Sequence, residues 1–264
     1  MFTIDINPVL VSLGPFEIRY YGLVFVLGFL IVLVVLQRAT KKNRIDMSKD
    51  QTYDLVFYLM IGVLIGARIF HIVFWDLDYY MKNLIKIFYI WEGGLSVHGG
   101  LLGGILSVYL FTKKHKLNFW KIADLLIIPA ILMLAFGRIA NFINQEILGT
   151  ITNVSWCVKF LGADPLYCRH PVQLYAALGR FSLFFFLLTL KDKYKDGFVF
   201  WNFIFLLSIG RFILDFIRED IRYMGLSAGQ WLSILMILFG GYVLFRFYRE
   251  DLKYSFWFKK KEEN

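Results

Sequence analysis

The stretch "IADLLIIPAILMLAFGRIANFINQEILG", residues 122–149, joins a long apolar run to a dense group of polar side chains. Its apolar part, 122–142, has the roughly 20 residues that a helix needs to cross a membrane, although Asp124, Pro129 and Arg138 interrupt it. An ionisable residue inside a membrane span is costly and indicates function by default. The stretch therefore predicts a membrane helix that ends in a polar, functional cluster.

Similar apolar runs recur along the whole chain. Apolar residues make up 58% of it, against about 45–50% in soluble domains. The runs predict an all-α integral membrane protein with one domain, 1–264, and seven transmembrane helices. These helices are expected at about 19–36, 54–74, 96–112, 122–142, 171–190, 198–214 and 231–247.

The loop charges predict the orientation of these helices. The segments 37–53, 113–121, 191–197 and 246–264 hold eighteen Lys and Arg residues, and the alternate segments 1–19, 75–95, 137–170 and 215–229 hold eight. Cytoplasmic loops are the basic ones. The N-terminus is therefore predicted outside and the C-terminus in the cytoplasm, which requires an odd number of spans. The net charge of +9 belongs to these loops and does not indicate nucleic acid as a partner.

Three segments outside the spans have distinct characters. Residues 75–95 are aromatic and interrupted, and predict an arm that lies on the outer membrane interface. Residues 150–170 form an outer head loop with both cysteines, Cys157 and Cys168, as either a disulfide or two buried thiols. A basic cytoplasmic tail is expected over about 248–264.

Polar residues within the spans gather toward the predicted outer face. They include Tyr21 at the start of the first span, His98 at the start of the third, and Arg138 and Arg211 at the ends of the fourth and sixth. If the helix at 122–142 continues, Arg138, Asn141 and Gln145 form one polar stripe, with Asn144 near it. Such a stripe suits a phosphate, because arginine offers a charged fork and asparagine neutral donors. A snorkelling arginine at a wet helix end is the simpler alternative.

The stretch "GRFILDFIRED", residues 210–220, repeats this pattern. A helix would place Arg211, Asp215, Arg218 and Arg222 on one face. The set reads either as a structural ion-pair ladder or as an anion site with Arg211 deepest in the membrane. Arg180 is ambiguous, since it could simply pair with an acid.

The stretch "WEGGLSVHGGLLGG", residues 91–104, places His98 where a helix begins. A helix N-terminus disfavours a protonated imidazole, so His98 could act as a neutral base. The glycines, spaced four apart, ordinarily indicate close helix packing. Four His and two Cys without close spacing predict no metal site.

Together, "GRIANFINQEILG", "HGGLLGG" and "RFILDFIRED" resemble the prolipoprotein diacylglyceryl transferase family over essentially the whole chain. The resemblance implies a multi-pass enzyme of the bacterial cytoplasmic (inner) membrane with its active site toward the outer leaflet. It would move a diacylglyceryl group from phosphatidylglycerol to the lipobox cysteine of a preprolipoprotein signal peptide, without a cofactor. Two departures are Asp215, where the family can carry Glu, and Ala140, where Gly is common.

The resemblance and the residue patterns together give the expected site. The expected catalytic residues are His98, Arg138, Arg211 and Tyr21. The expected substrate-binding residues are Arg138, Asn141, Asn144, Glu146, Gly149, Asp215 and Arg218. The base that takes the thiol proton is open among His98, Tyr21, a water molecule and the lipid phosphate. An anionic phospholipid transporter or flippase is the alternative function, but the chain lacks the internal repeat expected of many transporters.

Overall fold

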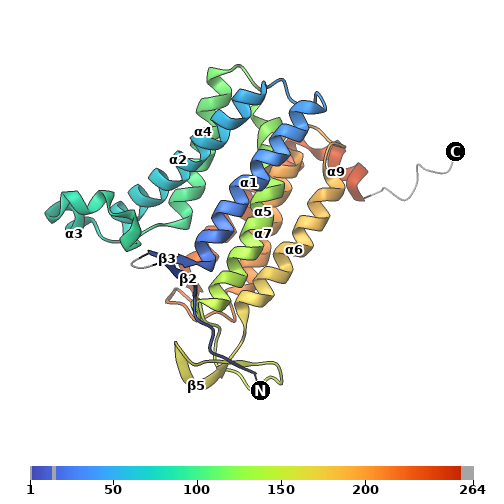
Figure 1. The fold of residues 1–264 in the computed structure, drawn as a ribbon. Helices are drawn as coiled ribbons and strands as arrows, with labels where there is room; N and C mark the ends of the chain where they lie inside the picture. The colour runs from blue at the N-terminus through green and yellow to red at the C-terminus, as the bar shows by residue number, and fades with distance from the viewer. Residues whose placement is uncertain (1, 14–15, 257–264) are drawn as a thin grey trace. The chain divides into compact units, whose positions relative to one another are not determined.

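The computed structural model describes residues 2–13 and 16–256, and it is mostly helical (Figure 1). The chain divides into two compact units, one of residues 1–28 and 124–264 and the other of residues 29–123. Each predicted apolar run coincides with a helix to within five residues at either end. Of the predicted basic tail, residues 257–264 lie outside the described residues.

The first unit contains most of the helices. They are the start of α1 (Tyr20–Lys41), most of α5 (Phe119–Ile143), α6 (Val172–Leu190), α7 (Phe198–Leu214), α8 (Ala228–Phe247) and α9 (Arg249–Phe256). Helix α7 packs against both α6 and α8. The core lies among α5, α6, α7 and α8, where Ile131, Leu187 and Phe198 are completely buried. Close van der Waals packing of this kind holds membrane helices together as a bundle.

Short strands in the same unit correct the purely helical prediction. Strand β1 (Phe2–Ile4) pairs in parallel with β4 (Val158–Phe160), which pairs antiparallel with β5 (Asp164–Arg169). Strands β2 (Val9–Leu13) and β3 (Phe16–Arg19) form one hairpin, and β6 (Arg222–Tyr223) and β7 (Leu226–Ser227) form another. These strands are too short for hydrophobic periodicity to reveal them.

Helix α5 runs without interruption through all three residues that break its apolar sequence. Its Asp124 carboxylate accepts hydrogen bonds from the backbone N–H groups of Gly197 and Phe200, both at 2.7 Å. Helix α7 begins at Phe198 and has no side-chain cap from its own N-cap residue, Gly197. Asp124 therefore satisfies two N–H groups at the start of another helix.

The second unit centres on α2 (Lys49–Phe74) and α4 (Val97–Lys114). These helices approach so closely that a Cβ atom added at Gly99 would collide with the backbone oxygen of Gly66, and one at Gly103 with that of Gly62. The close helix packing that the glycine spacing indicates is therefore present.

The predicted interfacial arm consists of short helices, α3 (Leu77–Lys82), η1 (Leu84–Phe88) and η2 (Ile90–Glu92). Buried Arg68 of α2 holds it in place. The Arg68 guanidinium donates to five backbone oxygens, those of Lys86, Ile87, Tyr89, Gly93 and Gly94, over 2.5–3.2 Å. The same group lies 4.8 Å from the ring centroid of Tyr80. One buried cation thus orders the arm through the arm's own backbone.

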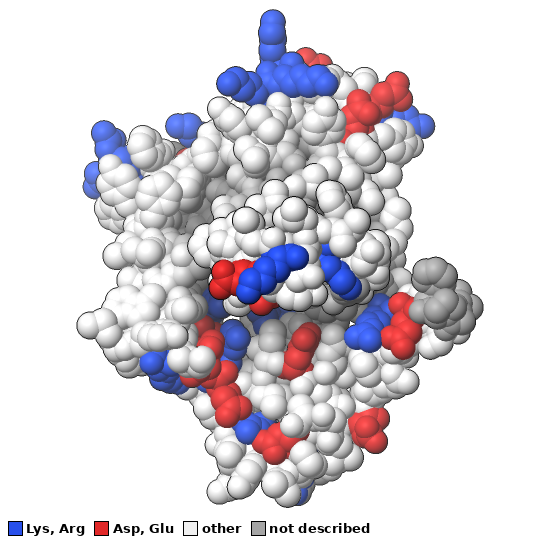
Figure 2. Space-filling view, turned by 90° about the vertical axis from the view of Figure 1, so that its left-hand side faces the viewer, with Lys and Arg blue, Asp and Glu red and all other residues white. Residues whose placement is uncertain are grey.

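Five of the described helices, α1, α2, α5, α6 and α8, are long and apolar enough to cross a membrane, and α7 is a shorter apolar helix. Their surfaces carry many exposed large hydrophobic side chains, such as Leu178, Leu238 and Phe245. Figure 2 shows a face on which broad uncharged areas separate the groups of charged residues. Such a surface suits a hydrocarbon surrounding and does not suit water.

Candidate anion-binding site

A pocket of about 350 Å³, its open mouth included, lies within the first unit. It is lined by Arg138, Ile147, Val172, Gln173, Ala176, Arg180, Arg211, Leu214, Asp215 and Arg218. These residues come from α5, α6, α7 and the segments that follow α5 and α7. The lining thus contains four arginines and one carboxylate, that of Asp215.

The segment after α5 folds back instead of continuing the helix. Helix α5 ends at Ile143, and Gln145 and Ile147 have φ angles of 55° and 58°. The Gln145 side chain accepts a hydrogen bond from the N–H of Gly162 at 2.7 Å and does not line the pocket. The predicted stripe of Arg138, Asn141 and Gln145 is therefore wrong in its last member, because the backbone turns before reaching it.

Asn141, Asn144 and Glu146 come together in this turn. The Glu146 carboxylate accepts from the Asn141 amide at 2.6 Å and from the Asn144 amide at 3.3 Å. Both amides thus contact the Glu146 carboxylate, and none of the three residues lines the pocket. Tyr21, in the first turn of α1, lies close enough for the charges of Glu146 and Arg138 to act on its hydroxyl.

Gly149 belongs to the frame of the pocket. It forms an antiparallel bridge with Arg218, and a Cβ atom added to it would collide with the backbone oxygen of His170. Neighbouring backbone hydrogen bonds join Leu148 to Glu219 and Thr150 to Ile217. The turn after α5 is thereby tied to the segment that carries Arg218, and only a residue without a side chain fits there.

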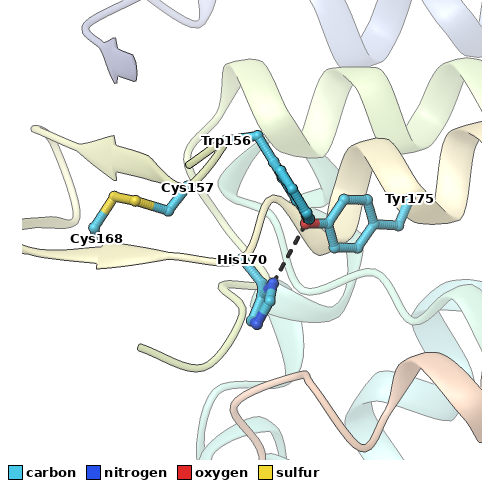
Figure 3. The surroundings of a disulfide bond; sticks show 5 residues. All are labelled: Trp156, Cys157, Cys168, His170 and Tyr175. Atoms are coloured by element: carbon cyan, nitrogen blue, oxygen red, sulfur yellow. Dashed lines mark hydrogen bonds between the residues drawn. A yellow bond between two sulfur atoms is a disulfide. The ribbon is translucent and has the colours of Figure 1, made fainter. Parts of the chain in front are cut away.

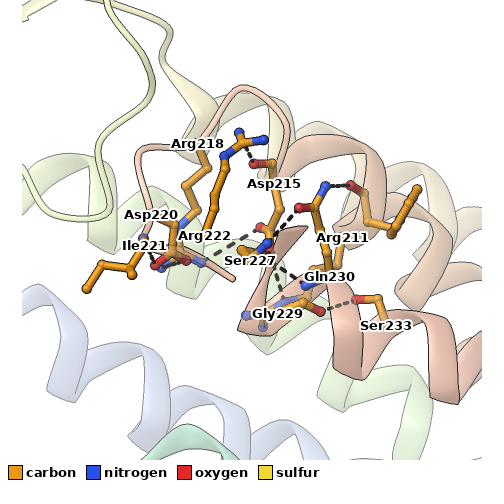
Figure 4. A network of polar contacts seen from close by, with 11 residues as sticks. Arg211, Asp215, Arg218, Asp220, Ile221, Arg222, Ser227, Gly229, Gln230 and Ser233 are labelled. Carbon is orange, nitrogen blue, oxygen red and sulfur yellow. Dashed lines mark hydrogen bonds and ion pairs between the residues drawn. The ribbon is translucent and has the colours of Figure 1, made fainter. Parts of the chain in front are cut away.

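The acid and arginines at the end of α7 and just after it form a compact network (Figure 4). Asp215, 3% exposed, lies 3.7 Å from Nε of Arg211 and 3.8 Å from the guanidinium of Arg218, and it accepts from the Ser227 hydroxyl at 3.1 Å. A Cβ atom at Gly229 would meet both the Asp215 carboxylate and the Arg211 guanidinium. The absence of a side chain at Gly229 therefore makes room for this ion pair.

The predicted single helical face through residue 222 is also wrong. Helix α7 ends at Leu214, so Arg218 reaches the pocket from the following turn. Exposed Arg222 donates to the backbone oxygen of Phe216 at 2.9 Å and does not line the pocket.

Sequence reasoning left Arg180 undecided and missed Gln173. Arg180 lies in the middle of α6, and its guanidinium donates to the backbone oxygen of Ala176 at 2.9 Å. An arginine inside an apolar helix was the signal that could have placed it in the site. Gln173 follows the helix start, where a polar residue usually faces solvent, so the sequence carried no signal for it.

The head loop beside this site is built around a disulfide between Cys157 and Cys168 (Figure 3). Next to it, the Tyr175 hydroxyl contacts the indole nitrogen of Trp156 at 2.6 Å and the His170 ring at 3.3 Å. Arg169, 7% exposed, pairs with Asp164 and Glu219 and donates to the backbone oxygen of Gly149. Its hydrogen bond holds the pKa of Asp164 below the usual range.

His98 lies in the first turn of α4, in the second unit, where its ring stacks with Phe70 at 6.3 Å. Its assignment to the same site as the arginines stays a prediction. Among the described residues, no group of three or more His, Cys, Asp or Glu side chains is arranged to hold a metal ion.

The pocket can bind an anion. The buried Nε atoms of Arg180, Arg211 and Arg218 have no hydrogen-bond partner among the described residues. Planar guanidinium groups bind phosphate oxygens well, and buried donors without partners are costly. The fold and the pocket together indicate a helical, multi-pass membrane protein whose pocket suits an anionic ligand.

The model of the prolipoprotein diacylglyceryl transferase family matches residues 8–246. The chain belongs to that family. Curated relatives named phosphatidylglycerol--prolipoprotein diacylglyceryl transferase include proteins of Geobacter sulfurreducens, 38% identical, Tolumonas auensis, 39%, and Idiomarina loihiensis, 40%. Each alignment covers 89% of this chain, and it covers 93%, 93% and 91% of the respective relative.

Proposed function

We propose that this chain transfers the sn-1,2-diacylglyceryl group of phosphatidylglycerol to the thiol of a lipobox cysteine in a preprolipoprotein. The products are a thioether and glycerol phosphate. The observation that carries the proposal is the pocket lined by four arginines and a single carboxylate. The names of the relatives supply the two substrates.

The chemistry needs an anion site of this kind. The thiol loses its proton to a base, since the thiolate is the nucleophile and a free thiol has a pKa of about 8.5. The sulfur then attacks the glycerol carbon, and the bond from that carbon to the phosphate oxygen breaks. Its electron pair stays on the oxygen, so the leaving glycerol phosphate gains negative charge. Preorganised cations stabilise that charge most where water is excluded.

Arg138 and Arg211 are the proposed catalytic cations, because both line the pocket in which the phosphate would lie. Arg218 binds the same phosphate, and buried Asp215 positions Arg211 and Arg218. Asn141, Asn144 and Glu146 hold the adjoining turn, and Gly149 keeps it against Arg218. His98 is the proposed base, with Tyr21 as its competitor.

The proposed topology has seven spans in the bacterial cytoplasmic membrane, with α4 and α7 added to the five longer apolar helices. The N-terminus and the pocket face the outer side, and the arm at 75–95 lies on the outer interface. The disulfide supports this orientation, because such bonds persist in oxidising compartments. Exposed Ile85, Phe88 and Trp91 support contact between the arm and lipid.

The test is transfer in detergent from phosphatidylglycerol to a peptide with one lipobox cysteine. We expect Arg138→Ala and Arg211→Ala to lower the rate by about 100-fold or more, and Arg222→Ala, outside the pocket, to keep it. If His98 is the base, His98→Ala should lose nearly all activity. If His98 only positions a substrate, the variant should keep part of it. If folded wild-type protein forms no thioether and releases no glycerol phosphate, the proposed function is wrong.

A further inference from the structure

Gln173 is a buried side chain of the pocket with one half of its amide unused. The residue is 1% exposed, and its Nε2 donates to the backbone oxygen of Glu146 at 2.7 Å. A backbone oxygen only accepts hydrogen bonds, so this contact fixes which end of the amide carries the NH₂ group. The other end, Oε1, is buried and has no hydrogen-bond partner among the described residues.

The unpaired Oε1 is free to accept a hydrogen bond from a ligand. A buried acceptor without a partner is costly, and the contacts described for the pocket's cations go elsewhere. Arg180 donates to the backbone oxygen of Ala176, while Arg211 and Arg218 pair with Asp215. A ligand that fills the pocket and donates to Oε1 would remove this cost.

The chemistry of the pocket narrows the class of ligand. A phosphodiester has only acceptor oxygens, so it satisfies the arginines and leaves Oε1 without a donor. An ammonium group could donate to Oε1, but four guanidinium groups against one carboxylate repel a cation. A hydroxyl group a few bonds from the phosphate satisfies both requirements, and the glycerol of a glycerophosphate group provides it.

We propose that Gln173 is a specificity-determining residue that accepts a hydrogen bond from a glycerol hydroxyl of the phospholipid headgroup. This inference rests on the proposed function for the identity of the lipid. A site built to bind a hydroxyl discriminates strongly against the analogue that lacks it, because its own polar group then stays unpaired. Gln173 therefore distinguishes phosphatidylglycerol from an equally charged lipid without hydroxyls.

The first test compares transfer from phosphatidylglycerol and from phosphatidylpropanol, which has the same charge and no headgroup hydroxyl. We expect wild-type protein to prefer phosphatidylglycerol by about tenfold or more in kcat/KM, and Gln173→Met to lose most of that preference. Gln145→Met is the matched control, since Gln145 contacts Gly162 and does not line the pocket. A Gln173→Met variant that keeps the wild-type ratio would overturn the proposal.

The second test needs no transfer and separates this inference from the proposed function. Calorimetry with purified protein compares the binding of sn-glycerol 1-phosphate, which has the configuration of the lipid headgroup, and propyl phosphate. We expect wild-type protein to bind sn-glycerol 1-phosphate more tightly by about tenfold. Gln173→Met should bind propyl phosphate as wild type does and should lack that preference. Equal binding of the two by wild-type protein overturns the inference whatever the variant does. A wild-type preference that Gln173→Met abolishes, in protein that transfers nothing, supports the role of Gln173 and refutes only the proposed reaction.

Discussion

Arg180 is a pocket residue whose side chain pairs with no acid among the described residues. Its described contact is with the backbone of its own helix, and its Nε has no hydrogen-bond partner among the described residues. Arg211 and Arg218, by contrast, share the buried Asp215 carboxylate. At the scale of single residues, Arg180 thus keeps donor capacity that it can offer a ligand.

We therefore predict that Arg180→Gln lowers kcat for diacylglyceryl transfer by about 10- to 100-fold, because an arginine that contacts the developing phosphate charge stabilises the transition state. Arg180→Lys should recover part of the rate, since lysine keeps the charge but loses the planar fork. Steady-state kinetics with both variants measure the effect, and Arg222→Gln serves as the control. Wild-type kinetics in Arg180→Gln would show that Arg180 only lines the pocket.

Most of the pocket's charged residues could be found from the sequence, because arginines within or next to apolar runs are rare and expensive. Arg138, Arg211, Asp215 and Arg218 were predicted in this way and line one pocket. Gln173 could not be found, since its role depends on burial against the turn after α5. Gly229 was missed for a similar reason, because it acts only by leaving space for the ion pair of Asp215 and Arg211.

At the scale of elements, the helices could be predicted to within a few residues, but the course of the chain beyond their ends could not. The apolar runs end within one residue of the ends of α5, at Ile143, and α7, at Leu214. The polar patterns beyond these ends were predicted to continue the helices, and they do not. Strand β1 could not be predicted from local sequence patterns either, since its partner β4 is more than 150 residues away. Contacts between distant segments decide these features, and periodicity within a window does not report them.

The start of α7 allows an element-scale prediction. Asp124 of α5 accepts two N–H groups there, so Asp124→Ala should lower the free energy of unfolding by about 1–2 kcal/mol, as the loss of a helix N-cap does. Asp124→Asn keeps an acceptor oxygen and should lose less. Thermal unfolding in detergent measures both, with Asp46→Ala, at an exposed acid, as the control. Equal stability of Asp124→Ala and wild type would contradict this account.

At the scale of the whole molecule, the alternation of basic and less basic loops predicts an odd number of crossings. We expect a fluorescent protein fused after residue 256 to fluoresce in bacterial cells, and alkaline phosphatase fused at the same point to be inactive. The same pair of reporters inserted in the head loop at Ala163 should give the opposite result. Matching results at the two positions would refute the predicted topology.

The attachment of the arm has a consequence for which mutations the chain can accept. Arg68 binds the arm through main-chain oxygens, which every amino acid supplies. Substitutions along most of 84–91 should therefore leave the attachment intact, and this segment is free to diverge in composition. Two places are exceptions, since Gly93 and Gly94 have φ angles of 90° and 71°, and a Cβ atom at Gly94 would meet Arg68 itself. Selection on this region should accordingly fall on one arginine and two glycines, while the exposed side chains between them adapt to different lipid environments.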